Sequence, residues 1–134
     1  MSRFTNTQHL YAVMEELWSR IKADQNMSNR LLQSRLIVRF HYKDPDGWVT
    51  VDGSDGKEIK VSIGHNELKP DVEMFMKADV AHHFWLGKEN PALALLTGKM
   101  QSKGQVNKAL ALLPVLKPAF EIYPGVLEDM EKSA

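Results

Sequence analysis

The spacing of apolar residues changes along the chain, and each spacing predicts a different kind of element. Near the N-terminus, six apolar residues recur at the spacing of one helix face: Leu10, Val13, Met14, Leu17, Trp18 and Ile21. Asn6 or Thr7 can cap this helix, because either side chain accepts a hydrogen bond from an unpaired backbone N–H. The pattern predicts a helix over residues 7–22, a break at 24–28 and a further helical turn at 29–33.

After residue 35, apolar and polar residues alternate, which is the period of a strand. Two turn signals, Asp44-Pro45-Asp46-Gly47 and Gly53-Ser54-Asp55-Gly56, separate the first three alternating runs. Short strands joined by tight turns indicate an antiparallel meander with one apolar and one polar face. The predicted strands cover residues 36–41, 48–52, 58–63, 71–77 and 100–103.

The rest of the chain supplies helices that cover the apolar face of this sheet. Helices are predicted over 79–86, with Asp79 as its cap, over 91–98, started by Pro91, and over 105–113. Prolines divide residues 114–124, so we expect few regular backbone bonds there, and a frayed end over 128–134. The predicted fold class is α+β: a five-stranded, mainly antiparallel sheet covered on one face by helices.

Length and composition narrow the function classes. With 134 residues, one domain over 1–134 is expected, made of an N-terminal helical segment (1–28) and a core of about 31–123. Seventeen basic and 17 acidic residues give no net charge, which removes the main argument for nucleic-acid binding. The absence of cysteine excludes thiolate nucleophiles and cysteine-ligated metals. No apolar run suits a signal peptide or a membrane span, so we expect a cytoplasmic protein without stable membrane insertion.

Three phrases occur in a fixed order along the second half of the chain. They are Asp71-Val72-Glu73-Met74-Phe75-Met76-Lys77-Ala78-Asp79, Phe84-Trp85-Leu86-Gly87-Lys88-Glu89-Asn90-Pro91 and Leu96-Thr97-Gly98-Lys99-Met100-Gln101-Ser102-Lys103-Gly104. These phrases and their order resemble the sterol carrier protein type 2 (SCP2-like) lipid-transfer family. The meander between Gly47 and Gly64 also fits, and the resemblance spans roughly residues 31–120. The chain ends Glu131-Lys132-Ser133-Ala134, which departs from the peroxisomal address that eukaryotic members often carry.

The resemblance implies a five-stranded sheet under helices, with an apolar tunnel between the two layers. Members of the family bind fatty acids, fatty acyl-CoA or sterols without performing chemistry, so we expect a lipid or other apolar ligand, no cofactor and no catalytic residue. The expected ligand-binding residues are Val72, Met74, Met76, Phe84, Leu93, Leu96, Met100, Leu110, Leu113, Leu116 and Phe120. Methionine suits such a wall, since its flexible thioether can repack around different guests. Opening for transfer is expected in the segment 114–124.

Two alternatives remain open from the residues alone. The same apolar residues suit a filled core, in which case the chain is an accessory module that binds another protein, and the helix over 7–22 is then a candidate contact for a partner or a second copy. Less favoured is a small-molecule enzyme that uses Asp79 and His83, which lie four residues apart on one helix. No metal site is expected, because no His-Glu-x-x-His spacing is present.

Overall fold

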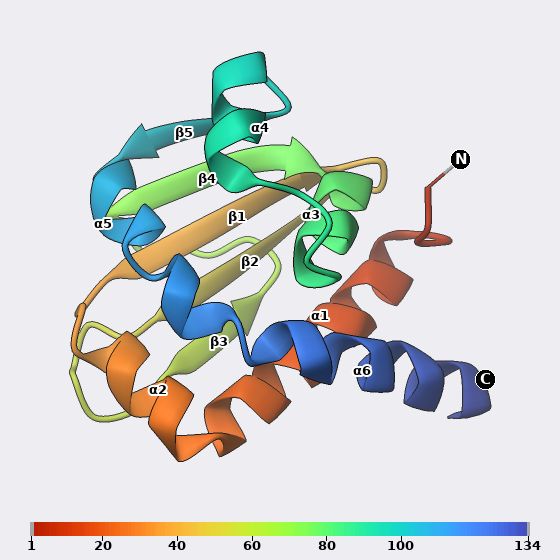
Figure 1. Ribbon diagram of the computed structural model, residues 1–134, viewed down its shortest axis with the longest axis horizontal. Helices are drawn as coiled ribbons and strands as arrows, with labels where there is room; N and C mark the ends of the chain where they lie inside the picture. The colour runs from red at the N-terminus through yellow and green to blue at the C-terminus, as the bar shows by residue number, and fades with distance from the viewer. Residues whose placement is uncertain (1, 134) are drawn as a thin grey trace.

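The computed structural model describes residues 2–133, which form a five-stranded sheet and a layer of helices (Figure 1). The strands are β1 (Ile37–Lys43), β2 (Gly47–Asp52), β3 (Lys60–Ile63), β4 (Val72–Lys77) and β5 (Met100–Gly104). The helices are α1 (Thr7–Ala23), α2 (Gln25–Leu32), α3 (Ala78–Trp85), α4 (Pro91–Thr97), α5 (Val106–Leu110), the 3₁₀ helix η1 (Leu113–Leu116) and α6 (Ala119–Ser133). The α+β class and all five strands are confirmed.

Local side-chain chemistry sets the ends of the first two helices. The Asn6 side chain accepts a hydrogen bond from the backbone N–H of His9 at 2.8 Å, so the predicted cap of α1 is confirmed. The predicted break at 24–28 is wrong, because α2 begins at Gln25. Asp24 alone separates the helices and caps α2, accepting from the backbone N–H of Met27 at 3.0 Å.

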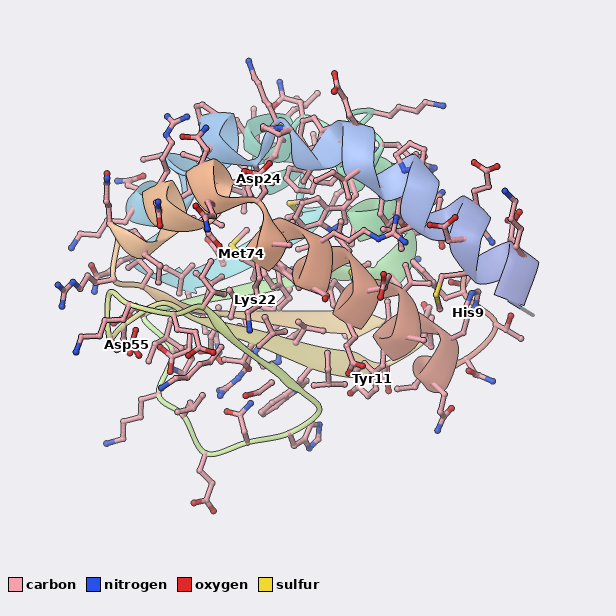
Figure 2. All side chains as sticks on the ribbon, turned by 90° about the horizontal axis from the view of Figure 1, so that it is seen from below. His9, Tyr11, Lys22, Asp24, Asp55 and Met74 are labelled. Carbon is pink, nitrogen blue, oxygen red and sulfur yellow. The ribbon has the colours of Figure 1, made fainter. Side chains whose placement is uncertain are left out.

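The sheet is mixed, with strand order β3-β2-β1-β4-β5. The pairs β1–β2, β2–β3 and β4–β5 are antiparallel, and β1–β4 is parallel, so the sheet is mainly antiparallel as predicted. Because β3 is an edge strand and β4 lies beyond β1, the connection over residues 64–71 must cross the sheet. It crosses the face opposite the helices, and Figure 2 shows yellow-green connections on that side.

The predicted polar face of the sheet is therefore only partly exposed to solvent. Arg39 and Thr50 point to that face and are buried. The Arg39 guanidinium donates to the Thr50 hydroxyl, to the side-chain oxygen of Asn66 and to the carbonyl of Leu68, and it lies over the ring of Trp48. The crossing connection supplies Asn66 and Leu68, so the route of the chain, which residue alternation does not reveal, explains this burial.

The C-terminal part departs most from the prediction. Residues 119–133 form one helix, α6, with Pro124 inside it, so the expected irregular segment is wrong for residues 119–124, and the frayed end is wrong for the described residues; Ala134 lies outside them. Residues 114–118 do lack a regular α-helix and form only the end of η1 and a turn. Ala119, Tyr123 and Val126 lie on one face of α6 at spacing i, i+4, i+7 and are fully buried. In Figure 1, α6 crosses α1, and the two helices pack together. This packing compensates for the backbone hydrogen bond that proline cannot donate.

Helix α3 also starts differently from the prediction. It begins at Ala78, and its cap residue Lys77 makes no side-chain capping bond. The Asp79 carboxylate instead accepts hydrogen bonds from Ser2 Oγ at 3.1 Å and from the backbone N–H of Arg3 at 2.7 Å. Asp79 therefore holds the N-terminal segment against α3 rather than capping the helix.

Candidate functional site

A cavity of about 100 Å³ lies between the inner face of the sheet and the helices that cover it. Leu36 and Tyr42 both line it, so the cavity follows β1 over roughly 20 Å, at ~3.3 Å per residue. It is narrow for this length. Figure 2 shows Met74 of β4 between the sheet and the helical layer, which is the level of the cavity.

The cavity wall is built from both layers of the fold. The sheet and the segments around it contribute Ser34, Leu36, Val38, Phe40, Tyr42, Val51, Gly53, Ile59, Met74, Met76 and Met100. The helices and their connections contribute Trp18, Leu31, Ala81, Phe84, Trp85, Pro91, Ala109, Leu110, Leu112, Leu113 and Leu116. Parallel pairing of β1 with β4 sets Phe40 beside Met74 and Tyr42 beside Met76, which makes one continuous apolar floor.

Seven of the eleven residues expected to bind ligand lie together in this wall: Met74, Met76, Phe84, Met100, Leu110, Leu113 and Leu116. The other four lie elsewhere. Val72 is fully buried but is not part of the wall, and Phe120 is half-buried with its ring 5.4 Å from that of Phe84. Leu93 and Leu96 on α4 are 56% and 83% exposed, because α4 turns the small Ala94 inward instead.

Sequence reasoning assigned no wall position to α1 or β1. Trp18, Phe40 and Tyr42 nevertheless line the cavity, and their rings form a chain with centroids 6.4 Å and 6.2 Å apart. The sequence did indicate that two of these residues face the interior, since Trp18 belongs to the apolar stripe of α1 and Phe40 to the apolar face of β1. What was missing was the pairing of β1 with β4, which brings these residues beside the methionines.

The wall is almost free of polar groups, and none of its residues is charged. Ser34 is satisfied locally, because its hydroxyl donates to the Leu31 carbonyl at 2.8 Å and accepts from the Leu36 N–H at 3.2 Å. Burial raises the pKa of Tyr42 well above the ordinary range of a phenol. This hydroxyl therefore stays protonated, and the site is chemically an uncharged, apolar container.

Asp79 and His83 on α3 do not form the catalytic pair that the enzyme alternative requires. Asp79 is engaged by the N-terminal segment, while His83 is exposed. His82 Nδ1 lies 2.8 Å from the hydroxyl of Tyr123. Within residues 2–133, no three His, Asp or Glu side chains are grouped so that they could hold a metal ion.

The apolar face of α1 is occupied within the chain itself. Its six stripe residues are all buried against the sheet and α6, so a partner or second copy would meet the polar face of α1. Among the described residues, no single helix has both the length and the apolar character needed to cross a membrane. The segments Val106–Leu116 and Ala119–Lys132, bent by 74°, meet that test of length and composition only when joined.

Comparison with known proteins decides the family. The model of the SCP-2 sterol transfer family matches residues 15–117. The chain belongs to this family. The resemblance inferred from the sequence is confirmed, and membership supports lipid binding or transfer, rather than catalysis, as the general role.

Individual relatives agree with this assignment. The chain is 29% identical over 107 residues to a curated protein of Caenorhabditis elegans called non-specific lipid-transfer protein-like 1, covering 79% of this chain and 88% of the relative. The apo structure of sterol carrier protein 2 from Yarrowia lipolytica superposes with a TM-score of 0.65 at 18% identity, covering 89% and 95% of the two chains. Sterol carrier protein domain 2 of Helicoverpa armigera gives 0.63 at 25% identity, covering 81% and 85%.

Proposed function

We propose that this chain is a carrier that binds one lipid or similarly apolar molecule, such as a fatty acid, a fatty acyl-CoA or a sterol, between its sheet and helices. The observation that carries the proposal is the elongated, uncharged cavity along β1. Each buried methylene of a guest contributes about 0.8 kcal/mol, so a chain of ~16 carbons gains on the order of 10 kcal/mol before entropic losses. With few polar anchors, the cavity should accept a range of apolar guests.

The volume of the cavity sets a condition on this function. Pockets for small molecules commonly measure ~300–1,000 Å³, several times the 100 Å³ found here. A lipid can therefore enter only if part of the wall moves outward. The short elements α5 and η1 supply Ala109, Leu110, Leu113 and Leu116 to the wall, and α5 has no buried residue. These two elements, residues 106–116, are the proposed lid, in place of the segment 114–124 expected from the prolines.

The small volume is also the one observation that favours the second candidate, a protein-interaction module with a vestigial cavity. Native mass spectrometry of the purified chain, followed by extraction of bound small molecules, separates the two. A carrier should release a lipid and take up a fluorescent fatty acid or sterol saturably. A chain without extractable lipid, without saturable uptake of either probe and with a stable protein partner in a pulldown would establish the second candidate.

A further inference from the structure

The wall of the cavity contains a hydrogen-bond donor without an acceptor. Trp18 is only 3% exposed and lies in the wall, packed edge-to-face on Trp85 with ring centroids 5.7 Å apart. Within residues 2–133, no group accepts a hydrogen bond from its indole N–H, and Trp18 Nε1 is the one buried side-chain nitrogen or oxygen left in this state.

An unpaired donor in the interior is costly. A buried polar group without a partner costs about 1–3 kcal/mol, and buried tryptophan usually finds an acceptor for its N–H. A phenylalanine would fill much of the same space beside Phe40 and Trp85 without this cost. The Trp18 ring borders the cavity, but its Nε1 is covered in the lipid-free structure. A guest can supply the missing acceptor once the wall has moved outward, the movement that the small volume of the cavity already requires.

Tyr42 and the absence of charge in the wall together indicate which kind of hydrogen-bond acceptor fits the cavity. The Tyr42 ring stacks on Phe40, the neighbour that it shares with Trp18, and it lines the same cavity. Because its hydroxyl keeps its proton, it too can donate. No wall residue carries a positive charge, so an ionised carboxylate placed here would be buried without a counter-ion, at a large cost in free energy.

We propose that the preferred guest carries an uncharged oxygen, as in a ketone, an ester or an alcohol, and that this oxygen accepts a hydrogen bond from Trp18 Nε1 inside the cavity. The inference rests on the proposed carrier function and narrows its ligand class. Trp18 is then a specificity-determining residue, and a guest with an anionic head keeps that head outside, in water.

The test compares guests of equal carbon number on the full chain: dodecane, methyl decyl ketone and dodecanoate. Each displaces diphenylhexatriene, a fluorescent hydrocarbon that has no oxygen. The variant Trp18→Phe removes the N–H and keeps an aromatic ring. It should weaken binding of the ketone by about 2- to 12-fold more than binding of dodecane, the range of one hydrogen bond. Dodecanoate should behave like dodecane.

The matched control is Trp48→Phe, the same substitution on the opposite face of the sheet, which should leave all three affinities unchanged. If Trp18→Phe weakens the ketone and dodecane equally, the anchor is wrong and the carrier function stands. If it weakens dodecanoate more than dodecane, the restriction to uncharged oxygens is wrong. If the native chain binds neither the fluorescent hydrocarbon nor any guest, the carrier function and the anchor both fail.

A second measurement needs no variant. In the NMR spectrum of the native chain, the Trp18 indole proton should move downfield when the ketone binds, because a new hydrogen bond deshields it, and should move less when dodecane binds. An unchanged or equal shift with both guests overturns the proposal even if Trp18→Phe does not fold.

Discussion

At the scale of single residues, position 104 requires glycine because the backbone at Asp71 approaches it closely. Gly104 ends β5 with φ of +87°, and a Cβ atom there would overlap the carbonyl oxygen of Asp71. That carbonyl accepts a hydrogen bond from the N–H of Gln105 at 2.9 Å, so it cannot easily turn away. Only glycine fits both the left-handed conformation and the space.

The variant Gly104→Ala should lower the free energy of unfolding by roughly 2–4 kcal/mol, through strain and overlap together. Gly98→Ala is the matched control, because Gly98 has a similar φ of +84° but open space around its Cβ position. It should lose only about 1–2 kcal/mol. Denaturant unfolding of both variants measures the difference, and equal losses would contradict the close-approach argument.

His82 predicts how stability responds to pH. Burial is the main cause that lowers the pKa of His82 below the ordinary 6.5, and the positive charge of Arg3 adds to it. The Tyr123 hydroxyl from α6 faces the ring at Nδ1. The carboxylate of Asp79 raises the pKa of His82, whereas His83 and Lys88 lower it, each by less than burial and Arg3. The fold thus favours the neutral form of His82.

A depressed folded pKa means that the unfolded chain binds the proton first on acidification. The contribution of His82 to stability is therefore complete above 6.5 and is lost as the pH falls below 6.5 toward the lowered folded value. Melting temperature should fall over this window in the native chain and fall less in His82→Asn. His83→Asn, at the exposed neighbouring position, removes only one of the smaller influences on His82 and should keep most of the native pH dependence. The same slope in all three chains would refute the assignment.

At the scale of elements, the proposed lid should be the least stable part of the cavity wall. Elements α5 and η1 have five and four residues, whereas α6 has 15 and buries Ala119, Tyr123 and Val126 completely. Amide hydrogen exchange should therefore be faster over residues 106–116 than over 119–130, and lipid loading should slow exchange mainly in the lid. Faster exchange in α6, or protection spread evenly over all helices, would place the opening elsewhere.

The elements also show how far a single sequence predicts this structure. Alternation over β1 to β5 is a local signal, so all five strands and the apolar face with Met74 and Met76 could be predicted. The parallel pairing of β1 with β4 is not local, and for this reason Tyr42 was missed as part of the wall. The family resemblance supplied the layer in which to expect a cavity, which hydrophobicity alone does not reveal.

Two other differences have physical causes of the same kind. In α4, Leu93 and Leu96 were expected to bind ligand, but close packing on β5 favours Ala94, and both leucines point to solvent. In α6, Pro124 suggested a break, but burial of one helix face against α1 outweighs the lost backbone bond. Tertiary packing decides both outcomes, and a pattern of residue types contains only part of it.

At the scale of the whole molecule, the unfilled cavity is a cost that a simple core would avoid. At ~24 cal/mol per Å³, an empty volume of 100 Å³ lowers the free energy of unfolding by about 2 kcal/mol. A carrier needs this empty space, and a guest that fills it restores the lost contacts. A larger cavity therefore gives more room for lipid but lowers the free energy of unfolding of the lipid-free chain.

Filling the cavity from its wall tests this opposition. Ala109 of α5 lines the cavity, so Ala109→Leu should raise the free energy of unfolding of the lipid-free chain by up to about 1 kcal/mol while weakening lipid uptake several-fold. Ala111→Leu, exposed just beyond the same helix, is the control and should change neither. If Ala109→Leu lowers stability and leaves uptake unchanged, the guest does not occupy the space beside α5, and the lid must be sought among the other helices of the wall.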